Sequence, residues 1–164
     1  MHPSPFGWTA RSDGSGTSVT LHDPAGQGRA SWSVPARSAA SNLQLVSLSQ
    51  GREHRVPLGN GPAAEGEAVI MNGQPRPVRR RDHNGSIELH GRRYDVQHGA
   101  RWRSTLLRDG RVVAVGRRGW FGRVFLERSA VEDAVDELAL ALFWFAVSPG
   151  RPGLIWMTFH TVSI

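Results

Sequence analysis

The fold is decided by residues 129–147, which read SAVEDAVDELALALFWFAV. Ser129 and Glu132 fit a capping box, in which each side chain bonds a backbone N–H left free at the start of a helix. Further carboxylates follow in the first two turns, where they complement the positive end of the helix dipole. Ser148-Pro149-Gly150 supplies a stop signal. We therefore expect a helix over residues 130–147.

The second half of this helix, residues 138–147, is apolar on every face. A helix lying on a sheet would keep a polar stripe toward water, so this one must be surrounded, by protein or by lipid. A bilayer span needs roughly 20 apolar residues, and residues 149–153, rich in Pro and Gly, interrupt the apolar run well before that length. The sequence therefore predicts burial in protein and no transmembrane segment.

Upstream of the helix, turn signals recur at short intervals. Asn72-Gly73, Asn84-Gly85, His90-Gly91 and Asp109-Gly110 separate runs that are rich in β-formers, and such dipeptides supply the positive φ of two-residue hairpins. We expect an antiparallel meander with strands over residues 67–71, 74–80, 86–90, 92–97, 102–108, 111–117 and 123–127.

The first half of the chain is less regular but also favours strands. Short runs over residues 17–21, 29–34, 43–49 and 53–58 are separated by Pro-, Gly- and Ser-containing turns, and a weak piece lies near Trp8. The count approaches about twelve strands, and a barrel that wraps one helix at normal packing distance needs about ten. We expect a mostly β fold, a single domain over residues 1–164, in which the meander closes into a barrel of about twelve strands around the helix. Residues 1–15 are expected to be a flexible N-terminus.

A resemblance agrees with this arrangement. The strand that ends at Asp109-Gly110, the return strand over residues 111–118, one more strand and the terminal helix together resemble the tubby C-terminal-like superfamily, especially its LURP-one-related and phospholipid-scramblase-like members. The resemblance covers residues 101–150 by pattern and the rest by strand count. It implies a twelve-stranded barrel threaded by a hydrophobic C-terminal helix. The calcium-binding acidic segment and the palmitoylation cysteines of scramblases have no counterpart here, so scramblase activity is not implied.

Composition limits the possible chemistry. The chain has 164 residues, a net charge of +6 and no Cys, which excludes disulfides, thiolate metal sites and cysteine nucleophiles. Catalytic motifs such as G-x-S-x-G, H-E-x-x-H and the phosphate-binding P-loop are absent. The best metal candidate is Glu88 with His90, joined by His83 or His98, and ordinary solvated strand positions explain these residues better. We expect a protein that is not an enzyme and has no cofactor, and the lack of a secretory signal favours a cytoplasmic location, with peripheral membrane binding as an option.

Arginine is the strongest functional feature. Residues 76–128 carry fourteen Arg and five acidic residues, 14 − 5 = +9. Guanidinium groups bind phosphate and carboxylate through paired N–H donors. The candidate anion-binding residues are Arg79, Arg80, Arg81, Arg92, Arg93, Arg101, Arg103, Arg117 and Arg118.

Three interpretations of this Arg set stay open at this point. The first is docking on anionic membrane lipid or on an acidic protein. The second is single-stranded nucleic acid, which Arg would hold electrostatically while Trp102, Trp120 or Phe121 stack on bases. The third is an ordinary solvated surface in a chain that lacks Lys, since strand alternation sends neighbouring Arg to opposite faces.

Overall fold

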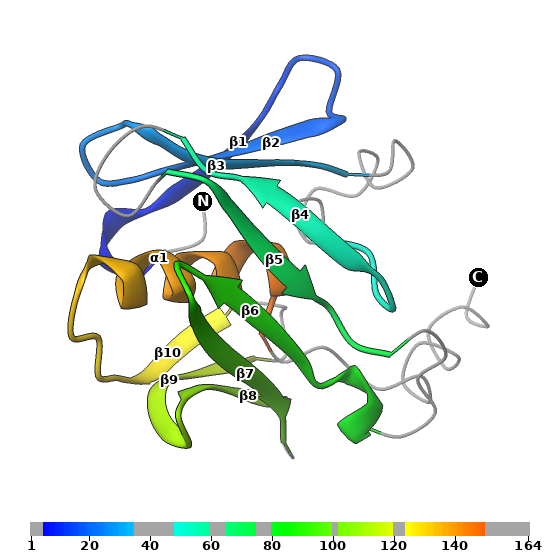
Figure 1. Cartoon of the computed structure of the whole chain (residues 1–164), viewed down its shortest axis with the longest axis vertical. Coiled ribbons are helices and arrows are strands. Elements are labelled where there is room, and N and C mark those ends of the chain that lie inside the picture. Colours follow the sequence, from blue (N-terminus) through cyan, green and yellow to red (C-terminus); the bar gives the residue numbers. More distant parts are fainter. Residues whose placement is uncertain are drawn as a thin grey trace.

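The computed structural model describes residues 5–34, 48–59, 65–74, 80–99, 102–119 and 124–149. These ranges contain two antiparallel sheets and one C-terminal helix (Figure 1). The expected mostly β fold with a C-terminal helix is therefore confirmed.

The smaller sheet is formed by the N-terminal part of the chain. A 3₁₀ turn, η1 (Pro5–Gly7), leads into β1 (Thr9–Ser12), β2 (Ser18–His22) and β3 (Gly28–Ser33), in the order β1-β2-β3. Residues 1–15, expected to be a flexible N-terminus, thus include η1 and a strand that pairs with β2.

The larger sheet is a seven-stranded meander in which each strand pairs with the next in the sequence. Its strands match six of the seven predicted between residues 67 and 127, and β4 matches the predicted run over residues 53–58. The bounds are β4 (Glu53–Pro57), β5 (Glu67–Met71), β6 (Gly85–Leu89), β7 (Arg92–His98), β8 (Arg103–Arg108), β9 (Arg111–Arg118) and β10 (Val124–Ser129).

Two predicted strands are not found where they can be checked. The strand expected over residues 74–80 falls mostly outside the described residues, and Arg80 begins the 3₁₀ turn η3 (Arg80–His83) instead. The strand expected over residues 43–49 is described only at Leu48 and Ser49, which are not in a strand. The Leu48 N–H donates a 2.7 Å hydrogen bond to the carbonyl of Ala146 in the terminal helix. Leu48 is thus bonded to the helix rather than to a neighbouring strand.

The two sheets meet between β3 and β4. An isolated antiparallel bridge joins Ala30 to Leu58, and the Gly59 N–H donates 2.8 Å to the carbonyl of Arg29. A Cβ at Gly59 would lie 2.2 Å from the carbonyl oxygen of Gly28, so glycine permits this approach. Within the described ranges β1 pairs with β2 and β10 with β9, and no ladder joins β1 to β10 to close a ring of strands.

The helix begins later than predicted. α1 (Ala134–Leu142) is preceded by the N-cap Asp133, and a π-helical turn, η4 (Phe143–Val147), continues it. The predicted capping box is wrong, because Ser129 is the last residue of β10 and pairs with Ala114 of β9. Asp133 caps the helix instead, and one of its oxygens accepts from the backbone N–H groups of Val135 and Asp136, each at 3.0 Å.

The enclosure of the helix is confirmed. Residues 138–147 are all buried except Phe145, which is partly buried and packs against the core. Figure 1 shows α1 between the three-stranded sheet and the lower strands of the larger sheet. Inward side chains of both sheets, among them Leu21, Ile70 and Leu106, complete one hydrophobic core with it. Residues 138–147 are thus surrounded by protein side chains.

Candidate functional site

Among the described residues, the Arg side chains of the predicted set lie in several different surroundings. Arg79 and Arg101 lie outside the described residues, and Arg80 is described only as the start of η3. Arg81 is exposed in η3, a turn that lies against β7. The other five lie on β7, β8 and β9, where strand alternation sends them to different faces.

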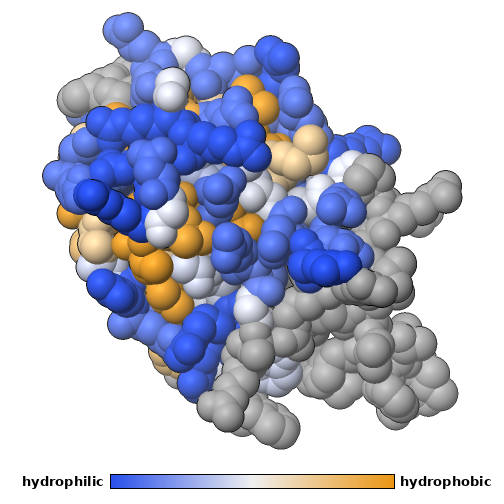
Figure 2. Space-filling model, turned by 60° about the horizontal axis from the view of Figure 1, so that its bottom comes forward, coloured by the Kyte–Doolittle hydropathy of each residue, from blue (hydrophilic) through white to orange (hydrophobic). Residues whose placement is uncertain are grey.

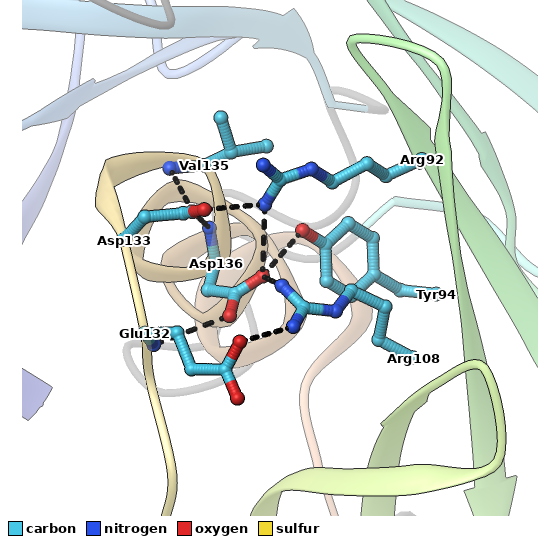
Figure 3. A network of polar contacts seen from close by, with 7 residues as sticks. All are labelled: Arg92, Tyr94, Arg108, Glu132, Asp133, Val135 and Asp136. Atoms are coloured by element: carbon cyan, nitrogen blue, oxygen red, sulfur yellow. Dashed lines mark hydrogen bonds and ion pairs between the residues drawn. The ribbon is translucent and has the colours of Figure 1, made fainter.

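Arg92 belongs to an internal polar network at the start of α1 (Figure 3). Its centre is the carboxylate of Asp136, a side chain with no exposed surface. One carboxylate oxygen accepts from the Tyr94 hydroxyl at 2.7 Å, from Arg108 at 2.6 Å and from Arg92 at 3.5 Å. The other accepts from the backbone N–H of Glu132 at 3.2 Å. Arg92 also pairs with Asp133 at 2.7 Å, so it neutralises internal carboxylates rather than an external anion.

This network shifts the protonation of its members. Burial, together with the hydrogen bond to Asp136, raises the pKa of Tyr94 to about 12. Hydrogen bonds from the backbone N–H of Asp136 and from Arg92 lower the pKa of Asp133. The hydrogen bond to Glu132 and the neighbouring charge of Asp136 raise the pKa of Arg108. These pKa shifts favour the charged forms of Arg108 and Asp133 and the neutral form of Tyr94.

Arg118 lies at the opposite end of the helix. Its guanidinium donates to the hydroxyl of Ser148 at 2.5 Å and to the carbonyl of Pro149 at 3.2 Å. Burial lowers the pKa of this guanidinium. A positive charge here faces the negative end of the helix dipole, and the last turn of α1 has no basic residue of its own. Within the described residues Arg118 thus acts as a helix-end contact.

Arg93 is exposed but already balanced. It lies on the outer face of β7, where it contacts Glu88 and Asp95, each at 3.2 Å. Two carboxylates around one guanidinium leave no local excess of positive charge.

Arg103 and Arg117 form the one predicted pair that the structure brings together. They are register partners on adjacent strands, β8 and β9, and their side chains are about half exposed, 54% and 50%. Both reach the same carboxylate, that of Glu127 on β10, at 2.7 Å from Arg103 and 3.8 Å from Arg117. Because two cations share one anion, this location keeps a positive excess.

Phe125 and Arg128 extend this location along β10. Phe125 pairs in register with Arg117 and is 47% exposed, although it is a large hydrophobic residue. A register shift between Leu126 and Arg128 marks a bulge, and Arg128 is exposed opposite Val115. We refer to Arg103, Arg117, Phe125, Glu127 and Arg128 as the β8–β10 outer face. Figure 2, which brings the lower side of Figure 1 forward, shows hydrophobic residues gathered among hydrophilic ones on that side of the molecule.

Sequence reasoning missed several of these residues. Asp136 is one of the carboxylates that the sequence relates to the helix dipole, and only the fold shows that it is buried against β7 and β8. The outward position of Arg128 follows from a bulge, which shifts the alternation, whereas Phe125 precedes the bulge and faces outward as the register partner of Arg117. Tyr94 faces inward on β7, and a tyrosine hydroxyl in the core is a sequence-level signal of a buried acceptor, which here is Asp136.

No family model, curated protein or solved structure matches the chain. The function must therefore be inferred from the geometry.

A metal centre and a membrane-spanning helix are two further features that the described part of the chain could carry. Its His, Asp and Glu residues form no group of three or more that would hold a metal ion. The metal candidate of the sequence analysis is divided, since Glu88 pairs with Arg93 while His98 contacts the Ser104 hydroxyl at 2.7 Å. None of its helices is both long and apolar enough to cross a bilayer.

Proposed function

We propose that this protein is a non-enzymatic binding domain that docks its β8–β10 outer face on the anionic headgroups of a membrane surface. The observation that carries the proposal is the Arg103–Arg117 pair, in which two half-exposed guanidinium groups on adjacent strands converge on a single carboxylate beside exposed Phe125.

The charge balance of this face supports an anionic target. Three Arg, at positions 103, 117 and 128, stand against the single carboxylate of Glu127. Guanidinium forks match the oxygens of phosphate and carboxylate groups. Each basic residue close to an anionic lipid surface contributes about 1 kcal/mol of binding free energy. A few such residues give a reversible, salt-sensitive association of the peripheral kind.

The exposed aromatic ring favours a lipid surface over an acidic protein or a nucleic acid. Phe125 stands in register beside Arg117, so the ring and the charge face the same side of the sheet. At a membrane, aromatic rings at headgroup level bury apolar surface while nearby Arg side chains contact phosphate. The described residues offer single-stranded nucleic acid only this one exposed ring on the face, whereas such proteins stack successive bases on several rings.

The relationship to tubby-like proteins and the closure of a barrel around α1 are also proposals. They are supported by the enclosed C-terminal helix and by the bridge between β3 and β4, which places all ten described strands in one continuous succession.

The test is vesicle co-sedimentation with phosphatidylcholine alone and with phosphatidylserine added. The variant Arg103→Gln/Arg117→Gln removes both charges of the pair and should weaken binding to the anionic vesicles about thirtyfold. The matched control Arg11→Gln/Arg55→Gln removes the same charge from β1 and β4, where both residues are exposed, and should change binding less than about threefold.

Equal binding by the variant and the control would overturn the proposal. A single-stranded oligonucleotide is the second arm of the experiment. Tight binding of the oligonucleotide that falls log-linearly with salt and quenches Trp fluorescence, with none to the vesicles, would favour the nucleic-acid interpretation instead.

A further inference from the structure

Glu127 is held in an unusual way for a residue on an exposed strand face. Its side chain is only 27% exposed, about half the exposed fraction of Arg103 and Arg117. One of its oxygens lies 2.7 Å from Nε of Arg103 and the other 3.8 Å from Nη1 of Arg117. The carboxylate thus lies between the two guanidinium groups, at the position where an external oxyanion would have to bind.

Glu127 lies two residues after Phe125 in β10, so strand alternation directs it to the same outer face, and a β-bulge begins at this point. In β10, Leu126 pairs with Gly116 and Arg128 pairs with Val115, so Glu127 is the additional residue between two consecutive positions of β9. Regular alternation would send residue 128 inward, whereas the bulge leaves Arg128 exposed on the same side of the sheet as Glu127. The backbone therefore presents an acidic side chain to the Arg pair and a third Arg beside it.

We propose that Glu127 is a built-in competitor that occupies the Arg103–Arg117 pair until the phosphate of an anionic lipid headgroup displaces it. This inference rests on the proposed function, because it concerns the regulation of the same site. Exposed ion pairs contribute little to stability, and the Glu side chain can rotate away into water, so the contact is easily opened.

Competition of this kind sets a minimum density of anionic groups that a surface must have before the domain binds to it. A dilute soluble anion must replace a carboxylate that is tethered beside the guanidinium groups and is therefore present at a high effective concentration. A membrane rich in anionic lipid presents many phosphates at once and also attracts Arg128. The competing carboxylate of Glu127 therefore restricts docking to densely anionic surfaces.

The test is the substitution Glu127→Gln, which keeps the length of the side chain and removes its charge. Binding to phosphatidylserine-containing vesicles should tighten about fivefold, the effect of one charge at the surface. The matched control is Glu67→Gln, which removes the same charge from a residue that pairs with Arg55 on strands β5 and β4. This control should change binding less than about twofold.

A second comparison separates the competitor from a simple change in net charge. In the Arg103→Gln/Arg117→Gln background, Glu127→Gln should give no more tightening than Glu67→Gln gives. With the Arg pair intact, Glu127→Gln and Glu67→Gln could tighten vesicle binding equally, or neither could tighten it. Either result would overturn the proposal that Glu127 competes with lipid phosphate. Failure of the proposed function is distinguishable, because it would show as unchanged binding when the Arg pair itself is removed. Circular dichroism and the melting temperature of each variant establish that all of them are folded.

Discussion

The Tyr94 hydroxyl donates a 2.7 Å hydrogen bond to the Asp136 carboxylate, and both side chains are completely buried. The two residues are 42 positions apart, so the contact ties the middle of β7 to the first turn of α1. Tyr94 must be neutral to donate this bond, and the same carboxylate also contacts Arg108 and Arg92. The contact thus favours the neutral form of Tyr94 in the folded core.

The titration of Tyr94 follows from this contact. The folded pKa, about 12, lies above the unfolded value near 10, so the contribution of Tyr94 to stability is complete below pH 10 and is lost as the pH rises through 12. Because Tyr94 is the sole tyrosine of the chain, the phenolate absorbance reports this residue alone. We expect a midpoint near pH 12 in buffer and near 10 in urea. A midpoint near 10 for the folded protein would contradict the buried hydrogen bond.

The substitution Asp136→Asn tests the other partner. It removes the charge that balances Arg108 and Arg92 in a buried location, and breaking such a group should lower the free energy of unfolding by about 3 kcal/mol. Urea denaturation measures the loss. The control Asp95→Asn removes an exposed carboxylate that pairs with Arg93, and should cost less than about 0.5 kcal/mol. Equal losses for the two variants would show that the Asp136 network is not a structural clamp.

The sequence predicted the meander well because its turns and its alternation are both local signals. Asp109-Gly110 turns β8 into β9, with both residues at positive φ, as the dipeptide predicts. The uniform apolar surface of residues 138–147 predicted the enclosure of the helix for the same reason. Closure of the strands into a barrel depends on contacts between distant segments, and no local pattern specifies those.

The helix start gives a direct test of the corrected capping residue. Asp133→Ala removes the side chain that accepts two backbone N–H bonds, and should cost about 1–2 kcal/mol. Ser129→Ala should cost less than about 0.5 kcal/mol, because Ser129 is an exposed strand residue. The pKa of Asp133 is lowered in the folded state, so its contribution is present above about pH 4 and is lost as the pH falls below that value. Thermal unfolding between pH 2 and 7 should therefore show the melting temperatures of the wild type and of Asp133→Ala converging at low pH. A larger loss for Ser129→Ala would restore the capping box.

The Arg set illustrates where sequence reasoning failed. Counting charges correctly located the excess in the middle of the chain, but it could not tell which Arg would meet internal carboxylates. Arg92 lies next to Arg93 in the sequence, yet one reaches the helix start and the other the outer face. Alternation predicts such a split, but the partners Asp133 and Asp136 lie 28 or more residues from the Arg they bind, so no local pattern identifies them. Among the described members of the set, Arg103 and Arg117 are the two that come together as a candidate site.

The last prediction concerns the packing of the helix end against β9. Gly116 faces inward, and a Cβ at this position would lie 2.9 Å from Cβ of Pro149 and 3.5 Å from Cε1 of Phe143. Gly116→Ala should therefore lower the free energy of unfolding by about 1–3 kcal/mol, because Pro149 belongs to a segment fixed by its contact with Arg118 and cannot move away freely. Gly14→Ala is the matched control, since an added Cβ there meets nothing within 4 Å, and it should leave stability unchanged or raise it by up to about 1 kcal/mol. Urea denaturation of both variants distinguishes a general effect of removing glycine from a specific clash. If Gly116→Ala were as stable as Gly14→Ala, the end of the helix would not be packed against β9, and the enclosure of the helix would have to be revised at that end.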